Sequence, residues 1–157
     1  MVTARQATNE FVDVHLDAAE LAEFIQNFGA RGHIESDLQQ LYRRVIFNAL
    51  VGNTDDHMRN HGFIRAPTGW RLAPAYDLNP NPGKRTHALK FDDATDVPDL
   101  DVILHTATFY RTDKSTAARL LSQLRAVTGD WRRMAKALKI AASEIAGTEA
   151  AFALSRS

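Results

Sequence analysis

One stretch, from Val45 to Pro80, constrains the fold of this chain more than any other part of its sequence. It begins as the apolar end of a helical pattern and then enters the polar run NTDDHMRN at positions 53–60. Two short apolar runs follow, separated by Pro-Thr-Gly at positions 67–69, and the stretch closes around Asp77. Proline and glycine between two such runs predict a β-hairpin, which returns the chain close to where it left. We therefore expect Asp77 to lie beside Asn60.

The side chains in this stretch are suited to phosphoryl transfer. Such a site needs a carboxylate that accepts the proton of an attacking hydroxyl, and hard oxygen ligands that hold Mg²⁺ against the phosphates. In protein kinases the catalytic base and a metal ligand have the spacing D-x-x-x-x-N, and a second metal-binding aspartate follows a short strand pair. Asp55 and Asn60 have this spacing, and Asp77 follows the expected hairpin. The pattern predicts Asp55 as the base, with Asn60 and Asp77 as metal ligands.

Each of these residues also has a simpler structural interpretation. Asp55 follows an apolar helix and would serve equally to cap its end or to open a turn. Asn60 and Asp77 are residue types that turns favour, and His57 would be an ordinary histidine with satisfied hydrogen bonds. Asp56 is interpreted as solvent-facing or structural, because adjacent side chains usually point apart. The site prediction therefore depends on the four other residues meeting at one point.

The runs GNTDDHMRNHGF at positions 52–63 and WRLAPAYDLNP at positions 70–80 resemble the HipA-like serine/threonine kinases. These kinases are toxin components of bacterial toxin–antitoxin systems. The similarity extends over roughly the whole chain, and these two runs make it specific. The resemblance places Asp55 at the catalytic aspartate of the family. It places Asn60 and Asp77 at the family's Mg²⁺ ligands.

The resemblance also implies which residues approach the nucleotide and which molecules take part. His57 and Arg59 lie where family members approach the nucleotide phosphates, and Tyr76 flanks the metal-binding aspartate. All three are therefore expected to contribute to cofactor binding. The implied cofactors are ATP and Mg²⁺, and the implied substrate is a protein hydroxyl group. The implied partner is a DNA-binding antitoxin protein.

The resemblance covers only the C-terminal lobe of such a kinase. The eight glycines of the chain form neither phosphate-binding pattern of nucleotide-binding lobes, and the first lysine is Lys84. We expect a single domain over residues 1–157 without an N-terminal nucleotide-binding lobe, which another chain would supply. Two other interpretations stay open. One is an inactive binding or regulatory module derived from the kinase, and the other is a metal-dependent hydrolase built from Asp55, His57 and Asp77.

The expected fold class is mainly α: a helical kinase-like C-terminal lobe with a short β-hairpin carrying the metal-site aspartate. Apolar residues at helical spacing predict helices over residues 17–28, 36–50, 115–128 and 131–138, and a last one after Ser143. Ser36 is expected to cap the second helix, and Arg44 is expected to be solvated. Val127, Met134 and Leu138 are expected to face inward in the later helices.

Composition sets further limits on function. Hydrophobic residues make up 45% and charged residues 24% of the chain, as in globular proteins. No apolar run approaches the ~18 residues of a membrane span, and no signal-like segment or cysteine is present, so we expect a cytoplasmic protein without membrane contact. Residues 110–139 hold eight bases against two acids. Since no aromatic interleaving accompanies them, we interpret them as solvated helix faces and do not expect direct nucleic-acid binding.

Overall fold

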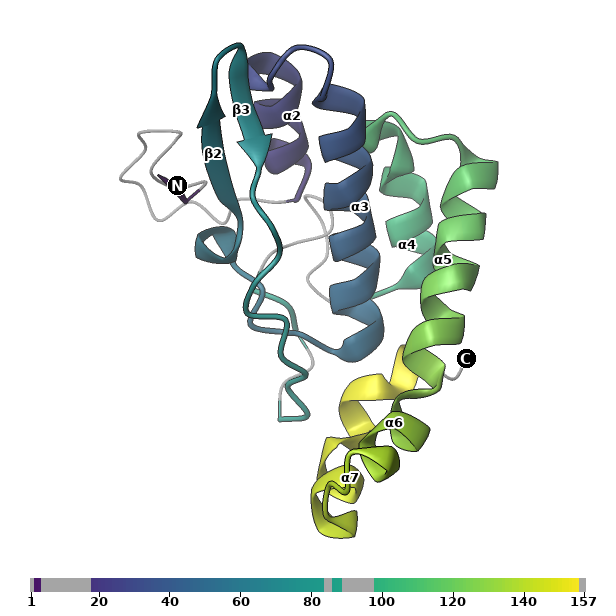
Figure 1. Ribbon diagram of the computed structural model, residues 1–157. Coiled ribbons are helices and arrows are strands. Elements are labelled where there is room, and N and C mark those ends of the chain that lie inside the picture. Colours follow the sequence, from purple (N-terminus) through teal and green to yellow (C-terminus); the bar gives the residue numbers. More distant parts are fainter. Residues whose placement is uncertain (1, 4–17, 84–85, 89–97, 156–157) are drawn as a thin grey trace.

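The computed structural model describes residues 2–3, 18–83, 86–88 and 98–155, and it is mainly helical (Figure 1). The elements in chain order, where η marks a 3-10 helix, are β1 (Val2–Thr3), α2 (Ala18–Phe28), α3 (Ile34–Val51), η1 (Met58–Asn60), β2 (Gly62–Ala66), β3 (Gly69–Leu72), α4 (Leu100–His105), η2 (Thr106–Tyr110), α5 (Lys114–Gly129), α6 (Trp131–Ala137), α7 (Ala142–Thr148) and η3 (Glu149–Ser155). The predicted combination of helices with a β-hairpin is confirmed. The expected first residue of the first helix, Asp17, lies outside the described residues.

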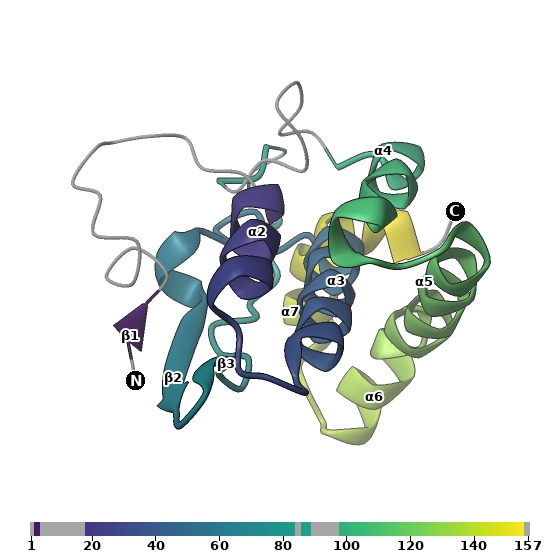
Figure 2. The ribbon, with the colours of Figure 1, turned by 90° about the horizontal axis from the view of Figure 1, so that it is seen from above.

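Helix α3 is the central element of the lobe. Figure 2 shows α2 and the hairpin on one side of it, and α4 and α5 on the other. Its apolar side chains with no more than 3% exposure are Leu38, Leu41, Tyr42, Val45, Ile46, Ala49 and Leu50. Burying a large apolar side chain contributes roughly 1.5–3 kcal/mol, so this helix is held firmly from several sides. A loop that leaves its C-terminal end therefore starts from a rigid support.

The predicted hairpin is tied to the first turn of α3. Strands β2 and β3 pair antiparallel with Phe63 opposite Leu72, and β1 adds a third strand that the sequence did not predict. The Asp37 carboxylate of α3 accepts hydrogen bonds from Arg71 Nε at 2.9 Å and from the Leu72 N–H at 3.0 Å. Because Asp37 is buried, these donors replace the water that its carboxylate loses. They also fix the direction in which β3 runs past the helix.

Helix α3 begins three residues earlier than a cap at Ser36 predicts. Its first residue is Ile34 and its N-cap residue is His33, whose side chain makes no capping hydrogen bond. The expected cap, Ser36, lies inside the first turn, where its hydroxyl donates to the His33 carbonyl oxygen at 2.8 Å. Gly32 has a φ of 79°, so the chain turns sharply before Ile34 and the helix starts at once. Ile34, in the first turn of the helix, packs against the core as a partly buried residue.

Three side chains of the C-terminal helices are exposed rather than inward as predicted. Val127 is 72%, Met134 50% and Leu138 70% exposed. Helix α6 buries Ala135, and beside it Trp131 stacks on Phe152 with ring centroids 4.4 Å apart. The helical pattern predicts an apolar stripe but not the width of the surface that covers it. Here α6 and α7 form a small extension below α5 (Figure 1), and the apolar side chains of this region are only partly covered.

We predict that Gly52→Ala destabilises the lobe more than a backbone effect alone would. Gly52 has a φ of 61°, and an added Cβ would lie 2.4 Å from the Ala151 carbonyl oxygen. A left-handed alanine costs about 1–2 kcal/mol, and overpacking adds about 1–3 kcal/mol to the loss in free energy of unfolding. Urea denaturation measures the total.

The matched control is Gly32→Ala, because Gly32 has a φ of 79° and nothing within 4 Å of an added Cβ. This control carries the backbone cost without the clash, so its loss should be the smaller one by about 1–3 kcal/mol. Equal losses for the two variants would contradict the close packing of Gly52 against Ala151.

Candidate active site

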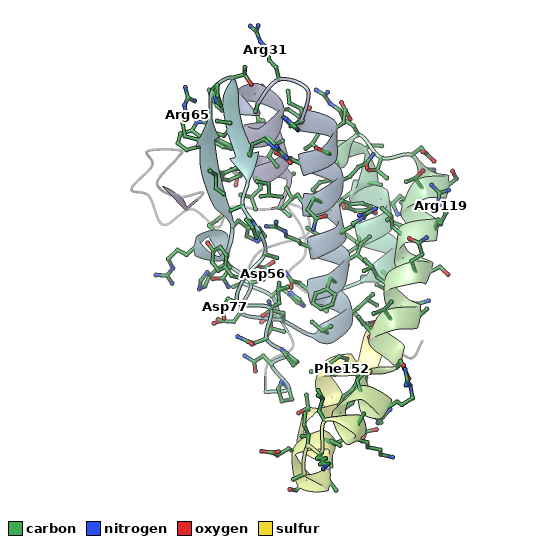
Figure 3. The ribbon with its side chains drawn as sticks, in the orientation of Figure 1. Arg31, Asp56, Arg65, Asp77, Arg119 and Phe152 are labelled. Atoms are coloured by element: carbon green, nitrogen blue, oxygen red, sulfur yellow. The ribbon has the colours of Figure 1, made fainter. Side chains whose placement is uncertain are left out.

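The predicted site residues gather where the chain leaves α3. Gly52 ends the helix in the left-handed conformation, and its N–H donates back to the Ala49 carbonyl oxygen. The loop of residues 53–57 then leads into η1, and the segment of residues 73–81 passes the same place after β3. Figure 3 shows Asp56 and Asp77 at this end of the lobe, close to the last turns of α3.

Asp56 is buried at the centre of a polar network. Its side chain is flanked by Asn48, whose Nδ2 donates to Oδ2 at 2.6 Å, and by His61, whose Nε2 lies 2.9 Å from Oδ1. Asn53 extends the network by donating to Asn48 Oδ1 at 3.1 Å. Of the two interpretations of Asp56, the structure supports the structural one, since only 4% of the residue is exposed. Its neighbour Asp55 is exposed, so the two carboxylates do face apart.

Arg44 is a buried member of the same region that the sequence did not identify. It was expected to be solvated, but it is only 5% exposed. Its Nη2 donates to the Ala73 carbonyl oxygen, while its Nε and Nη1 have no partner among the described residues. Burial lowers the pKa of Arg44, and the nearby Asp56 and Asp37 carboxylates act in the opposite direction. The available signal was its spacing: Arg44 lies one helical turn before Asn48, on the same face of α3.

The segment after β3 returns to the loop after α3, as the hairpin predicts. The Asn53 side-chain amide donates to the Asp77 carbonyl oxygen at 3.1 Å. The Tyr76 hydroxyl donates to the Arg59 carbonyl oxygen at 2.6 Å. The N–H of Asn81 donates to the Gly52 carbonyl oxygen at 2.9 Å. These bonds attach three points of the returning segment to the loop, to η1 and to the C-cap of α3.

Asn60 is attached to the residue expected to be the catalytic base. Its Nδ2 donates to the Asp55 carbonyl oxygen at 3.3 Å, so the amide oxygen is the end that remains for a cation. The carboxylate of Asp77 is exposed, and its Oδ1 accepts a hydrogen bond from Asn79 Nδ2 at 2.7 Å. Both groups are hard oxygen donors, and Mg²⁺ commonly uses one or two carboxylates together with phosphate oxygens.

The described residues contain no group of three or more His, Asp or Glu side chains placed to hold a metal ion. A site formed wholly by protein carboxylates and histidines is therefore not found in this part of the chain. Such a site would be needed by the metal-dependent hydrolase interpretation, which relies on a metal-activated water.

The remaining predicted residues lie along η1 and the returning segment. His57 precedes η1 and is half-buried, and its Nδ1 has no partner among the described residues. Arg59 is exposed, with its carbonyl oxygen bound by Tyr76. Burial raises the pKa of Tyr76, with a further increase from Asp77 and a decrease from Arg44. At neutral pH the hydroxyl therefore remains a hydrogen-bond donor.

The sequence matches the family of HipA-like C-terminal domains over residues 1–148. The chain belongs to this family. The resemblance inferred from the two motif runs is thus confirmed, and the HipA-like lobe described above is its fold. Comparison with curated proteins gave no match.

A solved structure supports the same fold. HipA of Shewanella oneidensis MR-1, determined in complex with HipB and operator DNA, superposes with a TM-score of 0.69 at 17% sequence identity. The match covers 98% of this chain and 37% of that HipA chain. The HipA-like lobe therefore spans well under half the length of that relative. Among its described helices, none has the length and apolar character that crossing a membrane requires.

We predict that two adjacent aspartates of the HipA-like lobe differ in their effect on stability. Asp56→Asn places an amide N–H₂ where Asn48 and His61 now meet a carboxylate, so one buried donor loses its acceptor. Such a loss costs about 1–3 kcal/mol in free energy of unfolding. Asp55→Asn changes an exposed residue and should alter it by less than about 0.5 kcal/mol. Urea denaturation of both variants tests the assignment, and a larger loss for Asp55→Asn would reverse it.

Proposed function

We propose that this HipA-like lobe carries the catalytic loop of a serine/threonine protein kinase. With an ATP-binding lobe in place, it would transfer the γ-phosphoryl group of ATP to a protein hydroxyl. The supporting observation is the arrangement at the end of α3. Asp55 is exposed, Asn60 is bonded to its carbonyl oxygen, and Asp56 beside it is buried in the network that fixes the loop.

In this proposal Asp55 is the general base. Its carboxylate orients the attacking hydroxyl of the substrate and accepts its proton. The loop that carries it starts at a buried helix and is fixed by Asn48 and His61 through Asp56, which limits the movement of the base. Positioning of this kind supplies much of the rate in phosphoryl transfer, because little covalent chemistry is left for the protein.

Asn60 and Asp77 are the proposed Mg²⁺ ligands, through the amide oxygen and the carboxylate. Bound Mg²⁺ would neutralise charge on the phosphates during transfer. The exposed Arg59 and the half-buried His57 are proposed to face those phosphates. Tyr76 was also expected near the nucleotide, but its hydroxyl is already bonded to the Arg59 carbonyl oxygen. Asp77, the proposed metal-site aspartate, follows the hairpin in the segment that Asn53 attaches to the loop.

The proposal includes partners and a place of action. The ATP-binding lobe would be supplied to the domain formed by residues 1–157, from another chain or from further sequence. The HipA of Shewanella oneidensis MR-1 was solved with HipB and operator DNA, so an antitoxin that binds DNA is the proposed partner. A toxin that uses ATP and a protein substrate would act in the cytoplasm.

We predict that Asp55→Asn abolishes phosphoryl transfer while leaving the fold intact. Removing a general base lowers the rate about 10²–10⁴-fold. The assay follows radiolabelled phosphate from ATP to protein, with Mg²⁺ and a HipA-like ATP-binding lobe added to the chain. Asp101→Asn is the matched control, because Asp101 is also an exposed aspartate but lies on α4. Transfer that survives in Asp55→Asn disproves the base assignment.

Calorimetry with Mg²⁺ and ATP separates the kinase from the inactive module. Binding that appears only after the ATP-binding lobe is added supports a kinase completed by that lobe. No binding in either case supports a regulatory module instead. Asp77→Ala should weaken binding of the metal–nucleotide complex, and an unchanged affinity would remove Asp77 from the proposed metal site.

A further inference from the structure

The returning segment, residues 73–81, has no regular secondary structure, yet it is bonded to its surroundings at intervals. At its start the Ala73 N–H donates to the Gly62 carbonyl oxygen at 2.8 Å, and the Ala73 carbonyl oxygen accepts from Arg44. At its end Asn81 is bonded to Gly52. Between these anchors lie the Tyr76 hydroxyl bond to Arg59 and the Asn53 bond to the Asp77 carbonyl oxygen.

The Tyr76 bond is placed next to both proposed metal ligands. Tyr76 immediately precedes Asp77, and Arg59 immediately precedes Asn60. The bond between the Tyr76 hydroxyl and the Arg59 carbonyl oxygen is 2.6 Å long, within the usual range for a hydroxyl donor. It joins η1 to the returning segment, one residue before each proposed ligand. Its loss would let the Asp77 segment move relative to η1.

The hydrogen bond between Tyr76 and the Arg59 carbonyl oxygen, called the tether below, also supports the backbone conformation of Asp77. Asp77 has a φ of 57°, a left-handed conformation that costs a non-glycine residue energy and needs support from its neighbours. Asn53 binds its carbonyl oxygen, Asn79 binds its carboxylate, and the tether holds the residue before it. The direction of the Asp77 carboxylate is therefore set by contacts around the residue.

We propose that Tyr76 is a positioning residue that fixes Asp77 relative to Asn60 through its bond to the Arg59 carbonyl oxygen. Its hydroxyl does not contact the metal or the nucleotide in this role. The inference rests on the proposed function in one respect, that Asn60 and Asp77 share a metal ion. The tether itself follows from the geometry of Tyr76 and Arg59 alone.

Tyr76→Phe tests the tether because it removes a single hydroxyl. Tyr42→Phe is the matched control: the Tyr42 hydroxyl also donates to a backbone carbonyl oxygen, that of Ile103 at 2.9 Å, but from the buried core. The first readout is the dissociation constant of Mn²⁺, measured on the whole chain by paramagnetic broadening, since oxygen ligands that suit Mg²⁺ also suit Mn²⁺. The second is amide hydrogen exchange at residues 58–60 and 76–79.

We expect Tyr76→Phe to weaken Mn²⁺ binding about 10-fold, as loss of a group that orients a metal ligand does. Exchange at residues 58–60 and 76–79 should be faster in this variant. Tyr42→Phe should lower stability but leave both readouts as in the unaltered chain. In the transfer assay, Tyr76→Phe should raise the Mg²⁺ concentration needed for half-maximal rate, while the rate at saturating Mg²⁺ is retained.

Unaltered Mn²⁺ affinity in Tyr76→Phe would overturn the inference, and so would an equal loss in Tyr42→Phe. If the unaltered chain binds Mn²⁺ neither alone nor with ATP and the ATP-binding lobe added, the proposed metal site is wrong, and exchange then decides whether the tether exists. Faster exchange in Tyr76→Phe alone would support a tether that positions the segment without a metal. Identical exchange in the unaltered and Tyr76→Phe chains would overturn it.

Discussion

The buried carboxylate of Asp56 determines the conformation of the candidate site. A carboxylate removed from water is stable only where hydrogen bonds replace the lost hydration. Asn48 on α3 supplies one donor, and His61 at the start of the hairpin lies against the other oxygen. One residue in the middle of the loop thus joins the helix before it to the strand after it. Asp55 faces outward as a consequence, because its neighbour is directed inward.

Two residues of this site have a positive φ, and only one of them carries a side chain. Gly52 turns the chain out of α3 at a φ of 61°, where the backbone of Ala151 leaves no room for a side chain. Asp77 has a similar φ of 57° but carries a carboxylate. Glycine would adopt that backbone at no cost, and aspartate is among the few other residue types that tolerate it. The position therefore keeps the carboxylate that the proposed metal site needs, at a modest backbone cost.

The sequence predicted local features well because their causes are local. The hairpin follows from turn residues between two apolar runs, and the return of Asp77 follows from the hairpin. Arg44 could not be predicted in the same way, because its acceptor, the Ala73 carbonyl oxygen, lies far along the chain. The prediction that Met134 and Leu138 face inward was wrong for a related reason. An apolar stripe does not specify how much of it a neighbouring helix covers. The pairing of β1 with β2 is also a long-range contact without a local signal.

The contacts that hold the site are made largely by atoms other than those that would do its chemistry. Asn60 is held through its amide nitrogen, which leaves the oxygen as the donor for a cation. Asp77 is held through its carbonyl oxygen by Asn53, and through the residue before it by the hydroxyl of Tyr76. If Asn60 and Asp77 bind a metal as proposed, ligands fixed in this indirect manner would lose little freedom, so less of the binding energy would be spent on ordering them. The buried network under Asp55 would serve the proposed base in the same way, because it orders the loop in advance of any substrate.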